Sequence, residues 1–234
     1  MKIGIFTDPH YSNKIEPSGN RLHALSYDKI REAMAHFKKE KVDLVICLGD
    51  LTDDCYDIAD NAKELKKLAD MINSFGIKFY SLMGNHDCLS FTKEEFNELT
   101  NGVYPPFKIE FESNILIFLD CNYSNDGEAY KVRKVDWTNT FLPADQFDKL
   151  KKVLENSKNK YVFLHQNLDK DVDANHIVHN AERIRKELEQ AENVKMVIQG
   201  HYHLGNDNEI NGIKYHTLPA MCTGEENYYE VIVI

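Results

Sequence analysis

Short apolar runs alternate with amphipathic segments along the first part of the chain. Residues 3–6, 42–48 and 77–82 are apolar runs of strand length. The segments 21–41 and 59–75, which lie between these runs, repeat apolar residues near the 3.6-residue period of a helix. Alternation of strands and helices is typical of a parallel sheet covered by helices. The pattern therefore predicts an α/β fold.

The rest of the chain continues this alternation with shorter elements. A capping box formed by Thr92 and Glu95 predicts a short helix within residues 90–101. Residues 122–139 are polar and irregular and include the only tryptophan, so we predict a long surface loop there. The pair Asn211-Gly212 is a strong hairpin signal. The further predicted elements are strands at 107–111, 115–119, 161–164, 194–199, 213–216 and 228–234, and helices at 143–156 and 181–191, the latter capped by Asn180.

Polar side chains that commonly bind metals follow five of the predicted strands. Because α/β folds place their ligand sites at the carboxyl ends of the strands, we expect these side chains to gather along one edge. Each has an ordinary explanation alone, such as a common turn at Asp8-Pro9-His10 or a structural role for His165. Five such strand ends together are hard to attribute to chance. The residues are Asp8 and His10, Asp50, Asn85 and His86, His165, and His201 and His203.

Composition narrows the classes of function. At 234 residues, 42% of them hydrophobic, we expect a single domain that spans residues 1–234. The formal net charge of −10 argues against stable binding to nucleic acid, which needs clustered Lys and Arg. A small anionic substrate fits this acidic chain if bound cations reverse the local field.

Cysteine usage and the lengths of the apolar runs bear on location. The five cysteines are odd in number and scattered, without a CxxC pair, which favours reduced thiols over a disulfide framework or a zinc site. The first apolar run is too short for a secretory signal, and no run approaches the length that spans a membrane. We therefore expect a soluble, cytoplasmic protein with no membrane contact.

The side chains at the strand ends indicate a pair of metal ions. Imidazole and carboxylate without thiolate suit Mn, Fe, Zn or Ni, and they suit Ca poorly. Seven ligands are too many for one ion, but they are the right number for two ions that share a carboxylate. Such ion pairs occur in enzymes that act on phosphorus. His176 and His179 are weaker candidates, because no apolar strand precedes them.

These motifs resemble those of the calcineurin-like metallophosphoesterases, especially the compact bacterial-type branch. All five blocks occur in the order found in that family and extend over nearly the whole chain. The resemblance implies a four-layer αββα sandwich, in which two mixed β-sheets are flanked by helices. The blocks are Asp8-x-His10, Gly49-Asp50, Gly84-Asn85-His86-Asp87, His165 and Gly200-His201-Tyr202-His203.

The resemblance also implies roles for these residues. His86 matches the histidine of the family that is not a ligand and that protonates the leaving oxygen or stabilises the transition state. Asp53 lies where some relatives place the acid that orients this histidine, although Asp54 and Asp87 compete for that role. A hydroxide that bridges the ions would attack phosphorus in line. Asp8, His10 and His203 would hold one ion, Asn85, His165 and His201 the other, and Asp50 would bridge the two.

Several activities fit this family. We expect a phosphodiesterase that acts on a small, nucleotide-type substrate, with a phosphomonoesterase or a nucleotide-diphosphate pyrophosphatase as the alternative. A non-catalytic scaffold with the same fold is an alternative of another class, which the intact ligand set and His86 disfavour. The acidic charge and the lack of an extra DNA-binding domain disfavour a nuclease. The loops 11–21, 88–104 and 122–139 are expected to choose the substrate, and the sequence leaves the native metal and the oligomeric state open.

Overall fold

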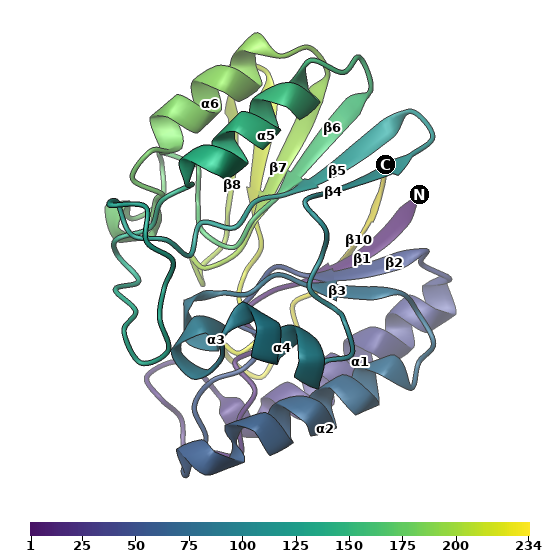
Figure 1. The fold of residues 1–234 in the computed structure, drawn as a ribbon. Helices are drawn as coiled ribbons and strands as arrows, with labels where there is room; N and C mark the ends of the chain where they lie inside the picture. Colours follow the sequence, from purple (N-terminus) through teal and green to yellow (C-terminus); the bar gives the residue numbers. More distant parts are fainter.

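The computed structural model describes residues 1–234, which form two β-sheets packed face to face between layers of helices (Figure 1). The first sheet has four strands in the order β10-β1-β2-β3. β1, β2 and β3 are parallel, and β10 runs antiparallel to β1. The strands are β1 (Lys2–Phe6), β2 (Leu44–Cys47), β3 (Phe79–Ser81) and β10 (Glu230–Val233).

The second sheet has six strands in the order β4-β5-β6-β7-β9-β8. The inner strands β5, β6, β7 and β9 are parallel, while β4 and β8 at the two edges pair antiparallel with their neighbours. Both sheets are therefore mixed, as the family resemblance implied. The strands are β4 (Lys108–Phe111), β5 (Asn114–Phe118), β6 (Asn159–Phe163), β7 (Val194–Gln199), β8 (Asn206–Ile210) and β9 (Ile213–Thr217).

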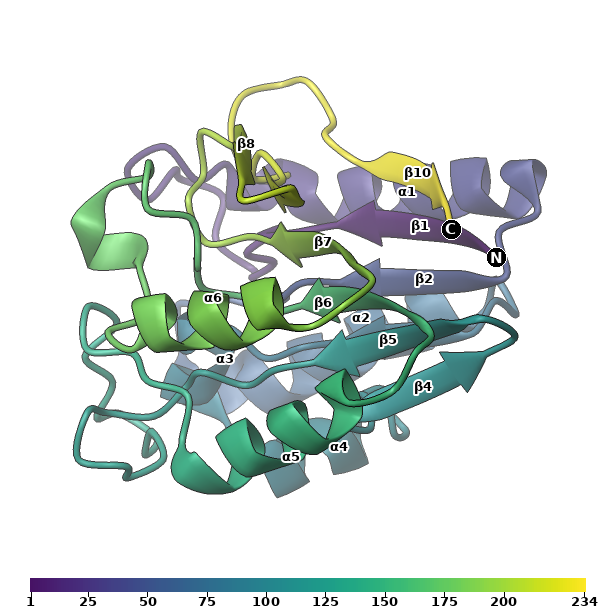
Figure 2. The ribbon, with the colours of Figure 1, turned by 90° about the horizontal axis from the view of Figure 1, so that it is seen from above.

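Helices cover the outer face of each sheet. α1, α2 and α4 lie on the side of the four-stranded sheet, and α5 and α6 lie on the six-stranded sheet (Figures 1 and 2). The helices are α1 (His23–Glu40), α2 (Asn61–Asn73), α3 (Asn85–Ser90), α4 (Lys93–Leu99), α5 (Ala144–Leu154) and α6 (Ala181–Gln190), and two 3₁₀ turns are η1 (Ile58–Asp60) and η2 (Ala174–His176). No helix is long and apolar enough to cross a membrane.

The period of two along each strand divides the core into three apolar interfaces. In β1, Ile3 and Ile5 point between the two sheets, whereas Phe6 points outward to the layer of α1 and α2. Phe118 and Phe163 meet these residues from the six-stranded sheet, with their rings stacked 5.3 Å apart. Each fully buried side chain of this size stabilises the fold by about 1.5–3 kcal/mol relative to exposure. The sandwich has the four layers that were expected.

The structure differs from the sequence-based expectation at two helices. Residues Asn85–Ser90 form α3, where a turn alone was expected after the third strand. The helix α6 begins where predicted, but the Asn180 side chain does not cap it. Instead, that amide accepts a hydrogen bond from the Leu142 N–H and donates one to the Leu142 carbonyl, so it fastens the loop before α5. The capping box of Thr92 and Glu95 is confirmed at α4.

Candidate metal centre

Loops from both sheets deliver the predicted ligands to one end of the sandwich. The four-stranded sheet contributes Asp8 and His10 after β1 and Asp50 after β2, and α3 carries Asn85 behind β3. The six-stranded sheet contributes the histidines. His165 follows β6, and His201 and His203 follow β7. These side chains are almost fully buried, except that of His203, which is 20% exposed.

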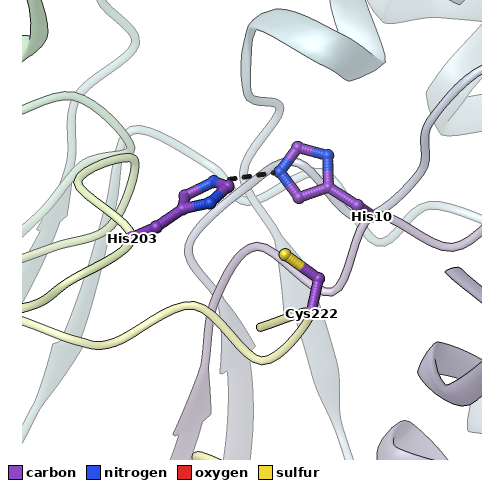
Figure 3. Close-up of side chains that lie close together, drawn as sticks. All are labelled: His10, His203 and Cys222. Carbon is purple, nitrogen blue, oxygen red and sulfur yellow. Dashed lines mark hydrogen bonds between the residues drawn. The ribbon is translucent and has the colours of Figure 1, made fainter. Parts of the chain in front are cut away.

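Three of these side chains form one group around the loop after β1. The Nε2 atoms of His10 and His203 lie 3.3 Å apart, and the two rings point toward each other in Figure 3. Asp8 Oδ1 lies 3.6 Å from His203 Nε2 and 3.8 Å from His10 Nε2. Three donors therefore converge within the reach of a single ion.

A second group lies around His165, and Asp50 touches both groups. His165 Nε2 is 3.2 Å from Asn85 Oδ1. One carboxylate oxygen of Asp50, Oδ2, lies 3.5 Å from His165 Nε2 and also 3.5 Å from His10 Nε2. The candidate ligand atoms of Asp50, His165 and His201 all lie within 4.8 Å of one another. Asp50 thus stands between the two groups.

Three buried atoms of the predicted ligands have no hydrogen-bond partner, namely Asp8 Oδ1, His10 Nδ1 and His201 Nε2. Asp8 Oδ1 and His201 Nε2 are free to bind an ion, whereas His10 Nδ1 faces Asp53 Oδ2 at 3.5 Å. Because buried polar atoms in proteins are normally paired, such atoms require an explanation, for which an ion is one of the usual candidates. A carboxylate oxygen and an imidazole nitrogen are both donors for Mn, Fe and Zn. The donor set therefore fits divalent cations.

The backbone adopts an uncommon conformation at the same positions. Asp8, His10, Asp50 and His201 have φ values of 50°, 47°, 50° and 65°, in the left-handed region that non-glycine residues rarely occupy. Each such conformation destabilises the fold by on the order of 1 kcal/mol or more, so the surrounding contacts must stabilise it. Gly84 lets two loops approach, because a Cβ at this position would lie 2.1 Å from Asp50 Oδ1.

The charges of the site compensate one another. Burial opposes ionisation of His10, but the nearby carboxylates of Asp50, Asp53 and Asp8 raise the pKa of His10 to about 9. His165 behaves alike: against the cost of burial, Asp50 and Asp8 raise its pKa to about 9. These interactions hold the pKa of Asp8 and of Asp50 below the ordinary value despite their burial.

A network of polar contacts behind the predicted ligands is centred on Asp53. Its Oδ1 lies 3.2 Å from His86 Nδ1, and its Oδ2 lies 2.9 Å from Arg21 Nε and 3.5 Å from His10 Nδ1. The rings of His10 and His86 pack edge to face at 4.6 Å. Asp53 therefore orients both a predicted ligand and the predicted acid.

The two acids that competed with Asp53 in the sequence have other partners. Asp54 pairs with Arg133 at 2.7 Å and accepts hydrogen bonds from Asn61 and Ser90. Asp87 is buried and accepts hydrogen bonds from the backbone of Leu51, Thr52 and Gly84, as well as from the Thr52 hydroxyl. It joins the loop after β2 to the start of α3. Neither residue reaches His86.

Cys222 was not predicted to lie at the site, and His176 was only a weak candidate. Cys222 lies beside His10 and His203 (Figure 3), on the segment after β9 that hydrogen-bonds to the Asp8 carbonyl. Burial raises the pKa of its thiol. His176 packs on His201 with ring centroids 4.8 Å apart, whereas the other weak candidate, His179, is exposed. Nothing in the linear spacing of these residues marks them.

The site opens into a cavity of about 380 Å³. The predicted site residues Asp50, Asn85, His86, His201 and His203 line it. Two predicted substrate loops also line it, through Asn20 and Arg21 and through Trp137, whereas none of residues 88–104 does so. A cavity of this volume is within the range of small-molecule sites.

Residues 1–205 match the family described as calcineurin-like phosphoesterases. The chain belongs to that family. A curated relative is the 3′,5′-cyclic adenosine monophosphate phosphodiesterase CpdA of Haemophilus influenzae. The two sequences are 23% identical over 229 residues, which cover 95% of this chain and 77% of the relative.

Solved structures agree with the fold. A dimetal phosphatase from Danio rerio superposes with a TM-score of 0.82 at 17% identity, covering 98% of this chain and 91% of that one. GAP50, described as the anchor in the inner membrane complex of Plasmodium, superposes with a TM-score of 0.62 at 16% identity, covering 97% and 75%. The α/β sandwich, the family and hydrolysis of phosphoric ester bonds are thereby confirmed.

Proposed function

We propose that this metallophosphoesterase is a phosphodiesterase with a dinuclear centre of Mn, Fe or Zn that acts on a small, nucleotide-type substrate. The position of Asp50 is the main support. Its Oδ2 lies 3.5 Å from both His10 Nε2 and His165 Nε2, which is what a shared carboxylate between two ions requires. The name of the curated relative, a cyclic nucleotide phosphodiesterase, supports the type of substrate.

The proposed ligand sets are those expected from the sequence. Asp8, His10 and His203 hold one ion, and Asn85, His165 and His201 hold the other. When bound, the ions would neutralise phosphoester charge and lower the pKa of the water nucleophile. The buried, unpartnered Asp8 Oδ1 and His201 Nε2 support one assignment in each set.

His86 and Asp53 supply the proton chemistry in this proposal. With its Nδ1 directed at Asp53 Oδ1 at 3.2 Å, His86 would use Nε2 to donate a proton to the leaving oxygen. Arg21 Nε is held by the other oxygen of Asp53, so that its guanidinium lines the cavity in a fixed position. The guanidinium of Arg21 favours a substrate whose charge grows on the phosphoryl oxygens.

Two alternatives remain as outcomes of the test. A phosphomonoesterase or a nucleotide-diphosphate pyrophosphatase would use the same metal centre, but its cavity would favour a different class of phosphate substrate. A non-catalytic scaffold would keep the fold without turnover, and the likeness to GAP50 makes this class worth testing. The orientation of His86 by Asp53 supports an enzyme, because a scaffold has no need of a positioned acid.

Location and organisation complete the proposal. We propose that residues 1–234 work as one domain, supported by the apolar interface that both sheets share. A cytoplasmic location is also proposed, supported by five free, buried cysteines. The expected partner is a small phosphorylated substrate rather than nucleic acid or membrane.

The deciding experiment compares a bis-aryl phosphate with the matching aryl monophosphate. The enzyme is stripped with a chelator and reloaded with Mn or Mg, and His86→Ala is the control variant. We expect Mn-dependent cleavage of the diester, faster than that of the monoester, and a loss of about 10²-fold or more in the variant because general acid catalysis is removed. Preference for the monoester would favour the first alternative. No turnover of any phosphoester, with two ions bound, would favour the scaffold.

A further inference from the structure

One wall of the cavity is aromatic and is not needed to hold ions. Trp137, His176 and Tyr202 line the cavity beside the predicted ligands, and the exposed Leu204 lies at the same wall. None of the three aromatic residues belongs to the proposed ligand sets. Their position next to His201 therefore needs another explanation.

The three rings pack on one another. Trp137 and His176 have centroids 5.2 Å apart, and His176 and Tyr202 have centroids 5.2 Å apart at 78°. Trp137 also meets His201 edge to face at 5.7 Å. The wall is thus built as a unit against a predicted metal ligand, and anything that contacts it lies next to the phosphoester.

The loop that carries Trp137 is fastened on several sides. Arg133 pairs with Asp54 at 2.7 Å, and its backbone N–H bonds to the Leu89 carbonyl of α3. The Tyr130 hydroxyl bonds to the carbonyls of Asp136 and Asn139, on either side of the tryptophan. Despite these anchors, the Trp137 side chain is 40% exposed. A large ring held in place but left open to the cavity is suited to contact a ligand.

The chemistry of the wall selects a flat, heteroaromatic group. Only three of the eleven lining residues are hydrophobic, so an alkyl chain would leave many polar groups unpaired. Aromatic side chains stack on bases, which have a π-face and polar edges. The Nδ1 atom of His176 lies 3.4 Å from Asp173 Oδ1, which helps to hold this ring in place at the wall.

We propose that Trp137, His176 and Tyr202 form the subsite for the nucleobase of the substrate, with Trp137 as the main stacking residue. This inference rests on the proposed function for the nature of the phosphoester. It adds the residues that distinguish a nucleotide from any other small phosphoester. It also gives the long loop 122–139 a role, as the carrier of the stacking ring.

The first test uses the fact that Trp137 is the only tryptophan. Adenosine, which has no phosphate, is titrated into the chelator-treated enzyme while tryptophan emission is recorded, with ribose as the matched control. We expect saturable quenching by adenosine and none by ribose. This readout needs neither metal nor turnover, so it decides the inference even if the proposed function fails. Absence of saturable quenching by adenosine would overturn the inference.

The second test measures competitive inhibition of the Mn-loaded enzyme by adenosine monophosphate and by ribose 5-phosphate, which differ only in the base. In the wild type we expect the nucleotide to bind at least about five-fold more tightly, from the usual range of base stacking. In Trp137→Ala the two inhibitors should bind about equally tightly, whereas Trp137→Phe should retain most of the preference for the nucleotide. Tyr228→Ala, at an exposed aromatic residue whose hydroxyl bonds to Glu226, should leave it unchanged. Equal weakening of both inhibitors in Trp137→Ala would contradict the subsite.

Discussion

Asp53 contacts three residues with different proposed roles: the acid His86, the cavity residue Arg21 and the metal ligand His10. One carboxylate oxygen faces His86, and the other faces Arg21 and His10. Burial disfavours its charge, but the hydrogen bonds and charges of the two imidazoles hold its pKa far below the ordinary value. Asp53 is therefore an anionic anchor that fixes the orientation of each of these groups relative to the cavity.

Replacing this anchor should impair proton transfer more than binding. For Asp53→Asn we expect kcat to fall by about 10–100-fold, the usual cost of removing an outer-shell partner, with little change in KM. The defect should shrink for a substrate whose leaving group is already a weak base, because that group needs less protonation. Steady-state kinetics on a series of aryl diesters of rising leaving-group pKa measures both effects.

Asp54→Asn is the matched control for this experiment. Asp54 is the next residue along the chain, but its partners are Arg133, Asn61 and Ser90. It should keep the wild-type dependence on the leaving group. A uniform loss across the series in Asp53→Asn, equal to that in the control, would show that Asp53 acts only through the fold.

Site residues that directly follow a buried strand could be predicted from the sequence. Site residues that are brought there by contacts across the fold could not. Asp8, Asp50 and His165 can be found because a buried strand delivers each of them. The choice of Asp53 over Asp54 and Asp87 depends on side-chain partners across the fold, which spacing does not reveal. Trp137 also lies at the site because Arg133 ties its loop back to α3 and to Asp54.

The element α3 illustrates a local limit of sequence patterns. Its six residues, Asn85–Ser90, are too few to show a helical period, and the glycine before them signals a turn. The helix forms because Asp87 accepts the backbone N–H of Gly84, and because the same carboxylate accepts those of Leu51 and Thr52. Tertiary contacts therefore create this helix, and with it the position of Asn85.

A link between strands of different sheets lies away from the site. His216 on β9 bonds to Glu230 on β10 at 3.0 Å and to Asp207 on β8 at 2.6 Å. The bond to Glu230 raises the pKa of His216 despite its burial, and Asp207 adds to this effect. The bond to His216 in turn lowers the pKa of Glu230. The imidazolium thus joins the edge strand of the four-stranded sheet to the other sheet.

This link should make part of the stability depend on pH. Because the folded-state pKa of His216 is raised above 6.5, its contribution is complete below that value and is lost as the pH rises through the folded-state pKa. The contribution of Glu230, whose pKa is lowered, is present above 4.5 and lost as the pH falls. The gap in unfolding free energy between wild type and His216→Gln should be largest between these values and smaller at alkaline pH. Urea denaturation at about pH 5.5 and 8.5 measures it.

His179→Gln serves as the control, because His179 is exposed. The unfolding free energy of this variant should differ little from that of the wild type at both pH values. A gap for His216→Gln that stays constant or grows toward alkaline pH would contradict the assigned charge state of the link.

At the scale of the whole molecule, the proposed ions join the two sheets and should stabilise the fold. An ion that binds only the folded chain at 100 times its dissociation constant adds about 2.7 kcal/mol, or roughly 5–10 °C in Tm for a chain of this size. We expect Mn to raise the Tm of the wild type but not that of Asp50→Asn, which should lose both ions and activity. Thermal denaturation with metal analysis of the purified protein tests this expectation.

The control for the loss of one carboxylate is Asp28→Asn. Asp28 lies on α1 and pairs only with the exposed Arg31. This variant should retain the stabilisation by Mn. If Asp50→Asn kept two ions and the full rate, the bridging role of Asp50 would be wrong.

The layered architecture was available from the sequence only in part. Alternation of strands and helices predicted the parallel core of the first sheet, whereas the second sheet and the four layers followed from the family resemblance. Periodicity gives the face of each strand, but it does not give strand order. The pairing of β1 with β10 joins residues at opposite ends of the chain, such as Lys2 and Val233. No local pattern encodes such a pairing.

The division of the ligands between two sheets has a consequence for the order of folding. Of the proposed ligands, Asp8, His10, Asp50 and Asn85 come from one sheet and the three histidines that remain from the second. Neither sheet alone therefore completes either proposed set. Contacts between such distant residues form late, because closing a long loop costs chain entropy before the new contacts stabilise the structure. The proposed ions would therefore bind only after the two sheets have docked. A rise in metal binding during refolding should report when the sandwich closes.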